Sequence, residues 1–242
     1  MIDIHTHILP GVDDGARDLS DSVAMAELAV SSGVHILVAT PHSNMRGRFE
    51  NYNSEEFRNG FQRLQKVIDG EGIPLLILPG MEIFTTHHVM KRIQEDELIS
   101  LNHSRYYLME FPFLSSYEEM NQELENVIVG GCIPVIAHPE RYESIQENPR
   151  RVASWRKKGM LIQVNRGSIL GKFGHRVKSC VDELLDDELV TCIASDAHKP
   201  YERTTFMGDI QEYMEKEYTF DYAKKLLYDN PKKIIENQNA IK

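Results

Sequence analysis

Short apolar runs recur along the chain, and between them lie longer segments in which apolar residues return every three or four positions. The short runs are typical of buried strands, and the longer spacing is typical of helices with one face in the core. The runs predict seven strands, at Ile2–His5, His35–Ala39, Leu75–Leu78, Tyr106–Phe111, Pro134–His138, Leu161–Val164 and Val190–Ala194. Their alternation with helices predicts an α/β fold with a parallel sheet.

Helices are predicted between these runs wherever one face of the segment is apolar. In the segment 55–69 that face is formed by Phe57, Phe61, Leu64 and Ile68, and Ser54 stands in the capping position. The other predicted helices are 20–32, with Ser20 or Asp21 as the cap, then Thr86–Glu95, Ser116–Val129, Asn148–Lys158, Val177–Leu185, Thr204–Glu215 and Phe220–Tyr228, with Asn230 capping a last turn. The polar stretch Asn44–Asn53 predicts a mobile loop.

The 242 residues show no linker, repeat or change in composition that would divide them, so a single domain over residues 1–242 is predicted. Seven strand–helix units in this length favour a closed barrel over an open sheet. Polar residues suited to chemistry follow six of the seven strands, and a barrel brings all its strand ends to one point, whereas an open sheet spreads them out. The predicted fold is a (β/α)7 barrel.

Composition narrows the classes of function. The net charge of −10 disfavours general nucleic-acid binding, although bound cations would reverse the local field at a phosphate site. No run approaches the roughly 20 apolar residues of a membrane span, and the N-terminus has no secretion signal, so a cytoplasmic protein without a membrane span is expected. Cys132, Cys180 and Cys192 form no C-x-x-C pair, and we interpret them as buried hydrophobic residues.

Imidazole and carboxylate side chains occur at or just after the ends of the apolar runs. His5 and His7 alternate on one strand, so both side chains point the same way. Glu110 stands within an otherwise apolar run, where a buried carboxylate needs a cation partner. The predicted metal ligands are His5, His7, Asp14, His42, Glu82, Glu110, His138, Asp196 and His198. Asp14 is preferred to Asp13, but strand periodicity does not operate in their turn and the choice stays open.

Any one of these residues alone would be interpreted as a capping or hydrogen-bonded polar group; together they predict a metal site. Four acids and five imidazoles, without a thiolate, suit Mn²⁺, Fe or Zn²⁺. Nine side chains are too many for one ion, so two or three ions per chain are expected. Ions roughly 3.5–4 Å apart clamp the attacking and leaving oxygens in hydrolysis.

Arginines follow two of the predicted ligands on what should be rim loops. Arg141 and Arg203 are predicted to bind phosphate, because a guanidinium fork matches phosphate oxygens. Arg166 is a weaker candidate, and Arg46 and Arg48 are placed to reach a substrate from their loop. The sequence has no Cys-x5-Arg, D-x-D-x-[TV], G-x-S-x-G or G-x-x-x-x-G-K-[ST] motif. A metal-activated water is the remaining nucleophile.

The segments MIDIHTHILPGVDDG, VATPHSN, PGMEI, YLMEFPF, VIAHPERY, QVNRGS, IASDAH and NPKKIIENQ resemble, in this order, the PHP (polymerase and histidinol phosphatase) superfamily. They are most similar to its bacterial CpsB/YwqE-type manganese-dependent protein-tyrosine phosphatases. The resemblance implies a distorted (β/α)7 TIM-like barrel with a trinuclear site, usually of Mn²⁺, with Fe, Zn or Mg as substitutes. It assigns one ion to His5, His7, Glu82 and Asp196, a second to Glu82, Glu110 and His138, and a third to Asp14, His42 and His198. It also implies that Arg141 and Arg203 bind phosphate.

The resemblance implies metal-dependent hydrolysis of phosphotyrosine on a protein, namely a bacterial tyrosine autokinase that regulates capsule or exopolysaccharide synthesis. The phenolate, with a pKa of about 10, is a good leaving group, so strong acid catalysis is unnecessary. His42 and His198 are the candidates for any proton donation to it. The alternative is a small-molecule phosphomonoesterase such as histidinol-phosphate phosphatase. Two further readings are a nuclease or polymerase-editing module, which the acidic charge disfavours, and a silent phosphate- or metal-sensing module, which the complete ligand set disfavours.

Overall fold

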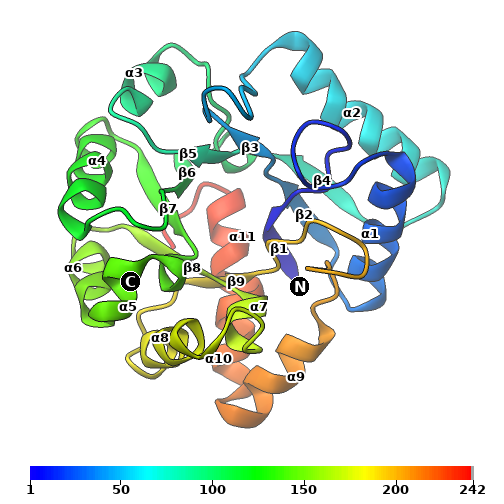
Figure 1. Ribbon diagram of the computed structural model, residues 1–242. Coiled ribbons are helices and arrows are strands. Elements are labelled where there is room, and N and C mark those ends of the chain that lie inside the picture. Colours follow the sequence, from blue (N-terminus) through cyan, green and yellow to red (C-terminus); the bar gives the residue numbers. More distant parts are fainter. Residues whose placement is uncertain (241–242) are drawn as a thin grey trace.

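The computed structural model describes residues 1–240 and contains a ring of parallel strands surrounded by helices (Figure 1). Every pair of hydrogen-bonded strands is parallel, as predicted. The strands are β1 (Ile2–Thr6), β2 (Ile36–Ala39), β3 (His42–Ser43), β4 (Leu76–Pro79), β5 (Glu82–Phe84), β6 (Tyr106–Glu110), β7 (Ile133–Ala137), β8 (Leu161–Asn165) and β9 (Cys192–Ala194).

Two positions in the ring are each filled by an interrupted strand. β2 and β3 are separated by Thr40 and Pro41, and β4 and β5 by Gly80 and Met81. β2 pairs with β4, and β3 pairs with β5. The first halves of the two interrupted strands are therefore neighbours, and so are the second halves. Pro41 has no N–H for the ladder. A Cβ on Gly80 would lie only 2.9 Å from Val38 Cγ1, so glycine allows the two segments to approach there.

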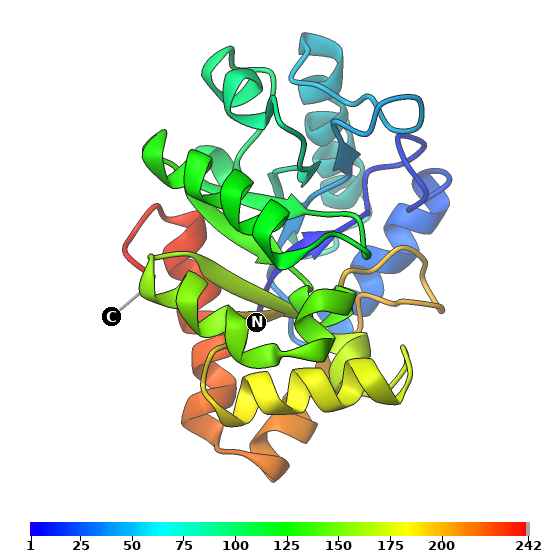
Figure 2. The same cartoon turned by 60° about the vertical axis from the view of Figure 1, so that its left-hand side comes forward.

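The ring closes where the chain after β9 meets β1. The strand orders are β1-β2-β4 and β3-β5-β6-β7-β8-β9, joined by the interrupted strands. Thr6 forms a parallel bridge with Ala197, His7 N donates to Ala197 O at 2.8 Å, and Asp196 N donates to His5 O at 2.9 Å. The nine strands thus occupy seven positions of a distorted barrel. Figure 2 shows α2 in cyan, α4 in green and α8 in yellow outside the strands. The predicted (β/α)7 barrel is confirmed.

The helices are α1 (Leu19–Ser31), α2 (Glu55–Gly70), α3 (Val89–Gln94), α4 (Tyr117–Val129), α5 (Glu143–Glu147), α6 (Val152–Lys157), α7 (Arg166–Ile169), α8 (His175–Asp186), α9 (Gly208–Glu217), α10 (Phe220–Lys224) and α11 (Asn230–Ile235), with short helical turns η1 (Leu101–His103), η2 (Pro139–Arg141), η3 (Pro149–Arg151) and η4 (Lys225–Asp229). The Ser54 side chain caps α2, as predicted. Ser116 and Glu119 form a capping box at the start of α4. No helix within residues 1–240 is both long and apolar enough to cross a bilayer.

Several predicted helix ends differ from the observed ones, and at two of them a neighbouring side chain or a tertiary contact takes the predicted capping residue. Asp18, not Ser20 or Asp21, caps α1, and Asp21 instead accepts from Arg17 Nε at 2.7 Å. α3 begins at Val89, α6 at Val152 and α9 at Gly208, each later than predicted. Asn230 caps nothing, because the π-helical turn η4 joins α10 to α11 and the Asn230 amide donates to Thr191 O at 2.8 Å. The predicted loop after the second strand contains an antiparallel bridge between Met45 and Phe49, and its mobility stays a prediction.

One end of the barrel interior is packed with apolar side chains, which leaves the other end for polar groups. Ile4, Leu108 and Val135 of the strands are fully buried in one cluster with Ile234 and Ile235 of α11. In Figure 1 α11 is seen through the ring of strands, and Figure 2 shows that it lies behind them, so it covers one end of the barrel. A second cluster fills the space between the strands and the outer helices. The three cysteines are free, and burial raises the pKa of the Cys180 and Cys192 thiols.

Candidate metal centre

The carboxyl ends of the barrel strands bring together all nine predicted ligands. His42 and Glu82 are the first residues of β3 and β5 and are register partners. Both therefore lie directly after a strand interruption, with their side chains at the centre of the cluster. The ligand atoms of the nine residues form four overlapping groups, and within each group the atoms lie within 4.8 Å of one another. These groups are His7, Asp14, His42 and His198; His5, His7 and Asp196; His5, Glu82 and His138; and His42, Glu82 and Glu110.

Glu82 lies in the middle of the cluster. Its Oε1 is 2.9 Å from His138 Nε2, and its Oε2 is 2.9 Å from His42 Nδ1. Glu82 belongs to two of the four ligand groups, so its carboxylate would be available to more than one cation. Glu110 lies closer to His42, at 3.4 Å from Oε2 to Nδ1, than to His138, at 3.8 Å from Oε1 to Nε2. The grouping of Glu110 with His138 that the family resemblance implies is therefore less tight than the grouping with His42.

The side chains fit cations because several of their buried polar atoms make no hydrogen bond and face one another instead. Within residues 1–240, the buried atoms without a hydrogen bond include His42 Nδ1, Glu82 Oε2 and Glu110 Oε2, which converge on one point. Burying two carboxylates so close together is costly unless a cation lies between them. Burial, and then the charge of Glu82, raise the pKa of Glu110 to about 8. Oxygen and imidazole donors in this proportion suit divalent transition metals.

The neighbouring acids Asp13 and Asp14 take different positions. Asp14 Oδ1 lies 3.5 Å from His198 Nε2 and 3.6 Å from His42 Nε2, so Asp14 faces the centre. Asp13 lies behind the imidazole of His7, whose Nδ1 is 2.7 Å from Asp13 Oδ2. The same oxygen accepts from the backbone N–H of His42 at 2.9 Å. Asp13 therefore orients one imidazole and holds the strand of another, as carboxylates behind metal-binding histidines do.

Gly15 allows this loop to fold back against β1. A Cβ at Gly15 would lie 2.1 Å from the carbonyl oxygen of His7, closer than any side chain allows. The Gly15 N–H also donates to Asp13 Oδ1 at 2.9 Å. The D-D-G sequence thus places one acid at the centre and one behind it, a division that strand periodicity did not predict.

β8, the strand without a predicted ligand, supports the ligands of its neighbours. Gln163 Oε1 lies 2.9 Å from His5 Nδ1, and Gln163 Nε2 donates to Asn165 Oδ1 at 2.8 Å. Asn165 Nδ2 donates to Asp196 Oδ2 at 2.6 Å. The sequence reasoning missed both residues. Their signal is two amides two positions apart in the apolar run LIQVN, which places both on the barrel's inner face.

Three site residues have backbone conformations in the left-handed region. The φ angles are 34° at His138, 50° at Asp196 and 47° at Arg203. This region is unfavourable for residues with a Cβ, and such residues concentrate at functional sites. In this fold the conformation directs each side chain from the end of a strand or from a loop toward the cluster.

Three arginines line a cavity of about 210 Å³ above the cluster: Arg48, Arg141 and Arg203. Arg203 Nη2 lies 2.6 Å and Arg141 Nη1 lies 3.4 Å from Asp196 Oδ2. Arg203 Nε is buried without a partner. Arg48 Nη2 lies 3.4 Å from Asp14 Oδ2. The cavity thus has carboxylates and imidazoles at its base and cationic donors around it.

The other two arginines considered from sequence do not line this cavity. Arg166 pairs through both arms with Asp209, with Nε at 2.7 Å from Oδ1. Arg46 is exposed on its loop. Neither position supports a role at the cluster.

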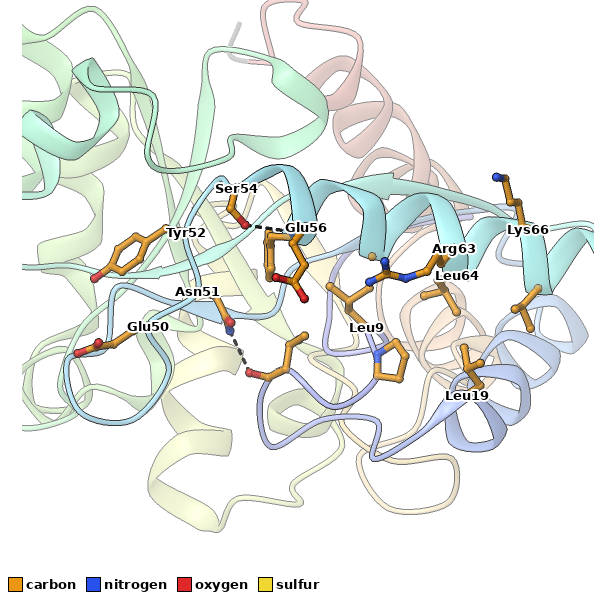
Figure 3. A pocket seen from close by; sticks show the side chains of 15 residues that line it. Leu9, Leu19, Glu50, Asn51, Tyr52, Ser54, Glu56, Arg63, Leu64 and Lys66 are labelled. Carbon is orange, nitrogen blue, oxygen red and sulfur yellow. Dashed lines mark hydrogen bonds between the residues drawn. The ribbon is translucent and has the colours of Figure 1, made fainter.

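A larger cavity, of about 720 Å³, lies between α2 and the loop that precedes α1 (Figure 3). Leu9, Val12 and Leu64 contribute to its apolar lining, and among residues 1–240 none of the nine predicted ligands borders it. Asn51 connects it to the cluster, because its amide donates to Val12 O at 3.0 Å and to His42 O at 2.7 Å. Size therefore does not identify the functional cavity; the chemistry of the lining does.

A parallel barrel whose strand ends gather imidazoles and carboxylates places the chain among α/β-barrel proteins with a candidate metal centre. The chain belongs to the capsular polysaccharide synthesis CpsB/CapC family, whose model matches residues 1–236. It is 37% identical over 242 residues to the tyrosine-protein phosphatase YwqE of Bacillus subtilis (strain 168), covering 100% of this chain and 94% of that protein. It is 33% identical over 243 residues to the tyrosine-protein phosphatase CpsB of Streptococcus pneumoniae, covering 98% of this chain and 99% of that protein.

A solved structure from the work on YwqE of Bacillus subtilis and CpsB of Streptococcus pneumoniae, described as metal-dependent tyrosine phosphatases, matches with a TM-score of 0.91. The two sequences are 38% identical, and the match covers 98% of this chain and 95% of that chain. The family indicated by the sequence motifs is confirmed, and so is its barrel.

Proposed function

We propose that this chain is a metal-dependent protein-tyrosine phosphatase. The observation that carries the proposal is the convergence of nine ligand side chains beneath three arginines in one small cavity. The relatives that span the chain are tyrosine-protein phosphatases, and the similar solved structure belongs to metal-dependent tyrosine phosphatases. Residues between His5 and Arg203 form the site, and α11 packs against the barrel strands, which supports the inference that 1–242 form one domain.

The proposed cofactors are two or three Mn²⁺ ions per chain, with Fe, Zn or Mg as substitutes. The overlap of four ligand groups through Glu82, His5, His7 and His42 supports more than one ion. The proposed ligands are His5, His7, Asp14, His42, Glu82, Glu110, His138, Asp196 and His198. Bound ions of this kind supply a hydroxide at neutral pH and neutralise charge that develops on a transferring phosphoryl group.

The side chains around the cavity have separate proposed roles. Arg141 and Arg203 bind the phosphoryl oxygens, orient the phosphorus for in-line attack and stabilise the charge of the transition state. Both guanidinium groups already meet at Asp196, so they are held together at the cavity wall. Either His42 or His198, which approach Asp14 near the cavity, is placed to give a proton to the leaving phenolate.

The proposed substrate is a phosphotyrosine protein in the cytoplasm, a bacterial tyrosine autokinase that regulates capsule or exopolysaccharide synthesis. The family's description as capsular polysaccharide synthesis proteins supports this assignment. The acidic composition gives no support to a nucleic-acid substrate.

The test compares two substrates before and after metal removal. Protein stripped with a chelator should release no phosphate from a phosphotyrosine peptide, and Mn²⁺ should restore the release. Histidinol phosphate should be a poor substrate for the same preparation. Asp196→Asn should remain inactive with Mn²⁺, whereas the exposed-site control Asp69→Asn should behave as wild type. Full activity without metal, or preference for histidinol phosphate, would overturn the proposal.

A further inference from the structure

An aromatic side chain stands at the wall of the otherwise polar cavity. Phe113 follows β6 in the segment Pro112–Leu114, and 42% of its surface is exposed although it borders the metal ligands. An exposed aromatic residue beside a polar site has no evident role in burying the core. Met45 is the other apolar residue that lines this cavity within the described chain. The cavity thus combines a charged base with apolar groups.

The position of Phe113 is well determined by its neighbours. Its carbonyl oxygen accepts from Glu143 N at 2.9 Å, which ties the segment to the start of α5. Its ring lies edge-on to the His138 ring at 6.2 Å. The Arg141 guanidinium carbon lies 4.5 Å from the Phe113 ring centroid and 4.8 Å from that of Phe173. One part of the Phe113 ring is therefore occupied by Arg141, and the exposed remainder is held in place before a ligand arrives.

The loop that carries Met45 is also held in a defined conformation. Met45 N donates to Phe49 O at 3.0 Å, and Phe49 N donates to Met45 O at 2.9 Å. The Phe49 ring stacks on the imidazole of His42, with centroids 5.4 Å apart and the planes at 7°. Phe113 thus contacts the ring of one predicted metal ligand directly, and Met45 is linked to another through Phe49.

We propose that Phe113 is the specificity residue that contacts the aromatic ring of an aryl phosphate, with Met45 as a second apolar contact; this inference rests on the proposed function. The cavity volume of about 210 Å³ lies below the roughly 300–1,000 Å³ of sites for larger ligands, which suits a small group such as a phosphoryl group with the rest of the substrate at the cavity wall. A phenyl ring bonded through oxygen to the phosphorus lies next to the arginines, where Phe113 stands. Aromatic pairs prefer offset or edge-to-face contact, which an immobilised ring at the cavity wall provides.

The test uses two competitive inhibitors that share the phosphonate group and differ in the ring, namely phenylphosphonate and methylphosphonate. Their inhibition constants are measured on the Mn²⁺-loaded enzyme, so no leaving group affects the comparison. Phe113→Ala should weaken phenylphosphonate roughly 2- to 12-fold more than methylphosphonate, the range expected from one aromatic contact. Phe113→Leu, which keeps apolar volume, should show a smaller difference in the same direction. Phe220→Ala, which removes an exposed phenylalanine from α10, should change neither constant.

Each result decides the assignment. Equal weakening of both inhibitors would show that Phe113 acts only by holding Arg141 and would overturn the proposal. Unchanged constants in both Phe113 variants would also overturn it. A wild-type enzyme that hydrolyses no phosphotyrosine peptide would refute the proposed function itself, whereas loss of ring discrimination in an active phosphatase refutes only the role of Phe113.

Discussion

His7 Nδ1 lies 2.7 Å from Asp13 Oδ2, so the imidazole of a predicted ligand is fixed by a carboxylate that is not itself at the centre of the cluster. This contact leaves His7 Nε2 to face Glu82 Oε2 at 3.3 Å and Asp196 Oδ1 at 3.4 Å. Histidines behind which a carboxylate sits are oriented in one tautomer and bind metal more strongly. The two adjacent acids of this turn thus take different positions, with Asp13 behind a predicted ligand and Asp14 facing the centre.

Asp13→Asn should weaken metal binding without removing a ligand. The amide keeps one oxygen that can accept from His7, but it loses the negative charge. With one oxygen it cannot accept from His7, Gly15 N–H and His42 N–H as the two carboxylate oxygens do. Metal affinity should fall about 10- to 100-fold, as for other second-sphere changes at metal sites. Competition with a chelator of known affinity measures this loss, and Asp69→Asn on the outer face of α2 is the control. An unchanged affinity would contradict the role assigned to Asp13.

Metal analysis should find more than one ion per chain. Nine ligand side chains in four overlapping groups exceed the needs of one cation, so protein purified without a chelator should hold two or three equivalents of transition metal. EDTA should abolish turnover. His5→Ala should lower the metal content while the barrel stays folded by circular dichroism. One equivalent or fewer in a fully active preparation would be inconsistent with a multinuclear centre.

Substitution of Arg141 or Arg203 should separate catalysis from metal binding. Both guanidinium groups line the cavity above the cluster, so alanine variants should keep their metal and lose about 10- to 100-fold in kcat/KM, from a charge-assisted hydrogen bond worth roughly 1.5–3 kcal/mol. Lysine should restore little, because a single ammonium group does not make a forked contact. Arg150→Ala, at an exposed arginine, is the matched control. Full metal content with unchanged kcat/KM would show that these arginines do not bind substrate.

The three cysteines should be dispensable for turnover. Cys180 and Cys192 are buried, and burial raises the pKa of both thiols, which keeps them protonated and unreactive. A folded variant with all three cysteines changed to alanine should keep most of its phosphatase activity. Loss of turnover in such a variant, or rapid inactivation by alkylation of one thiol, would point to a covalent route.

The metal-free protein should become less stable as pH rises toward 8, in part through Glu110. Its carboxyl has a pKa raised to about 8 by burial and by Glu82, against about 4.3 in an unfolded chain. Between these values the folded state holds one more proton than the unfolded state, so this contribution to stability is complete below about pH 4 and is lost as pH rises through 8. Glu110→Gln should reduce that dependence. Urea unfolding in EDTA at pH 5 and pH 8 measures it, and an identical dependence in both proteins would contradict the assignment.

Local sequence patterns determined the order of the elements and most of the candidate ligands. Buried strands must be apolar on both faces, and helices must return an apolar face every three or four residues, so both signals exist before any tertiary contact forms. Against that background His5, His7 and Glu110 stand out, because a polar group at the end of a buried strand requires a partner. A barrel then gathers strand ends, and this is why residues far apart in the sequence could be assigned to one site.

Only the tertiary structure decided which of these residues face the centre of the cluster and which support the predicted ligands from behind. Asp13 and Asp14 share one local pattern, and the approach of Gly15 to the His7 carbonyl separates their roles. The support that Gln163 gives to His5 joins strands 158 residues apart, so no local window contains it. Phe113 looks like an ordinary loop residue until the fold places it against Arg141 and the cavity. The spacing of residues along a chain constrains which side of an element they occupy, but the groups that they contact depend on how distant elements pack.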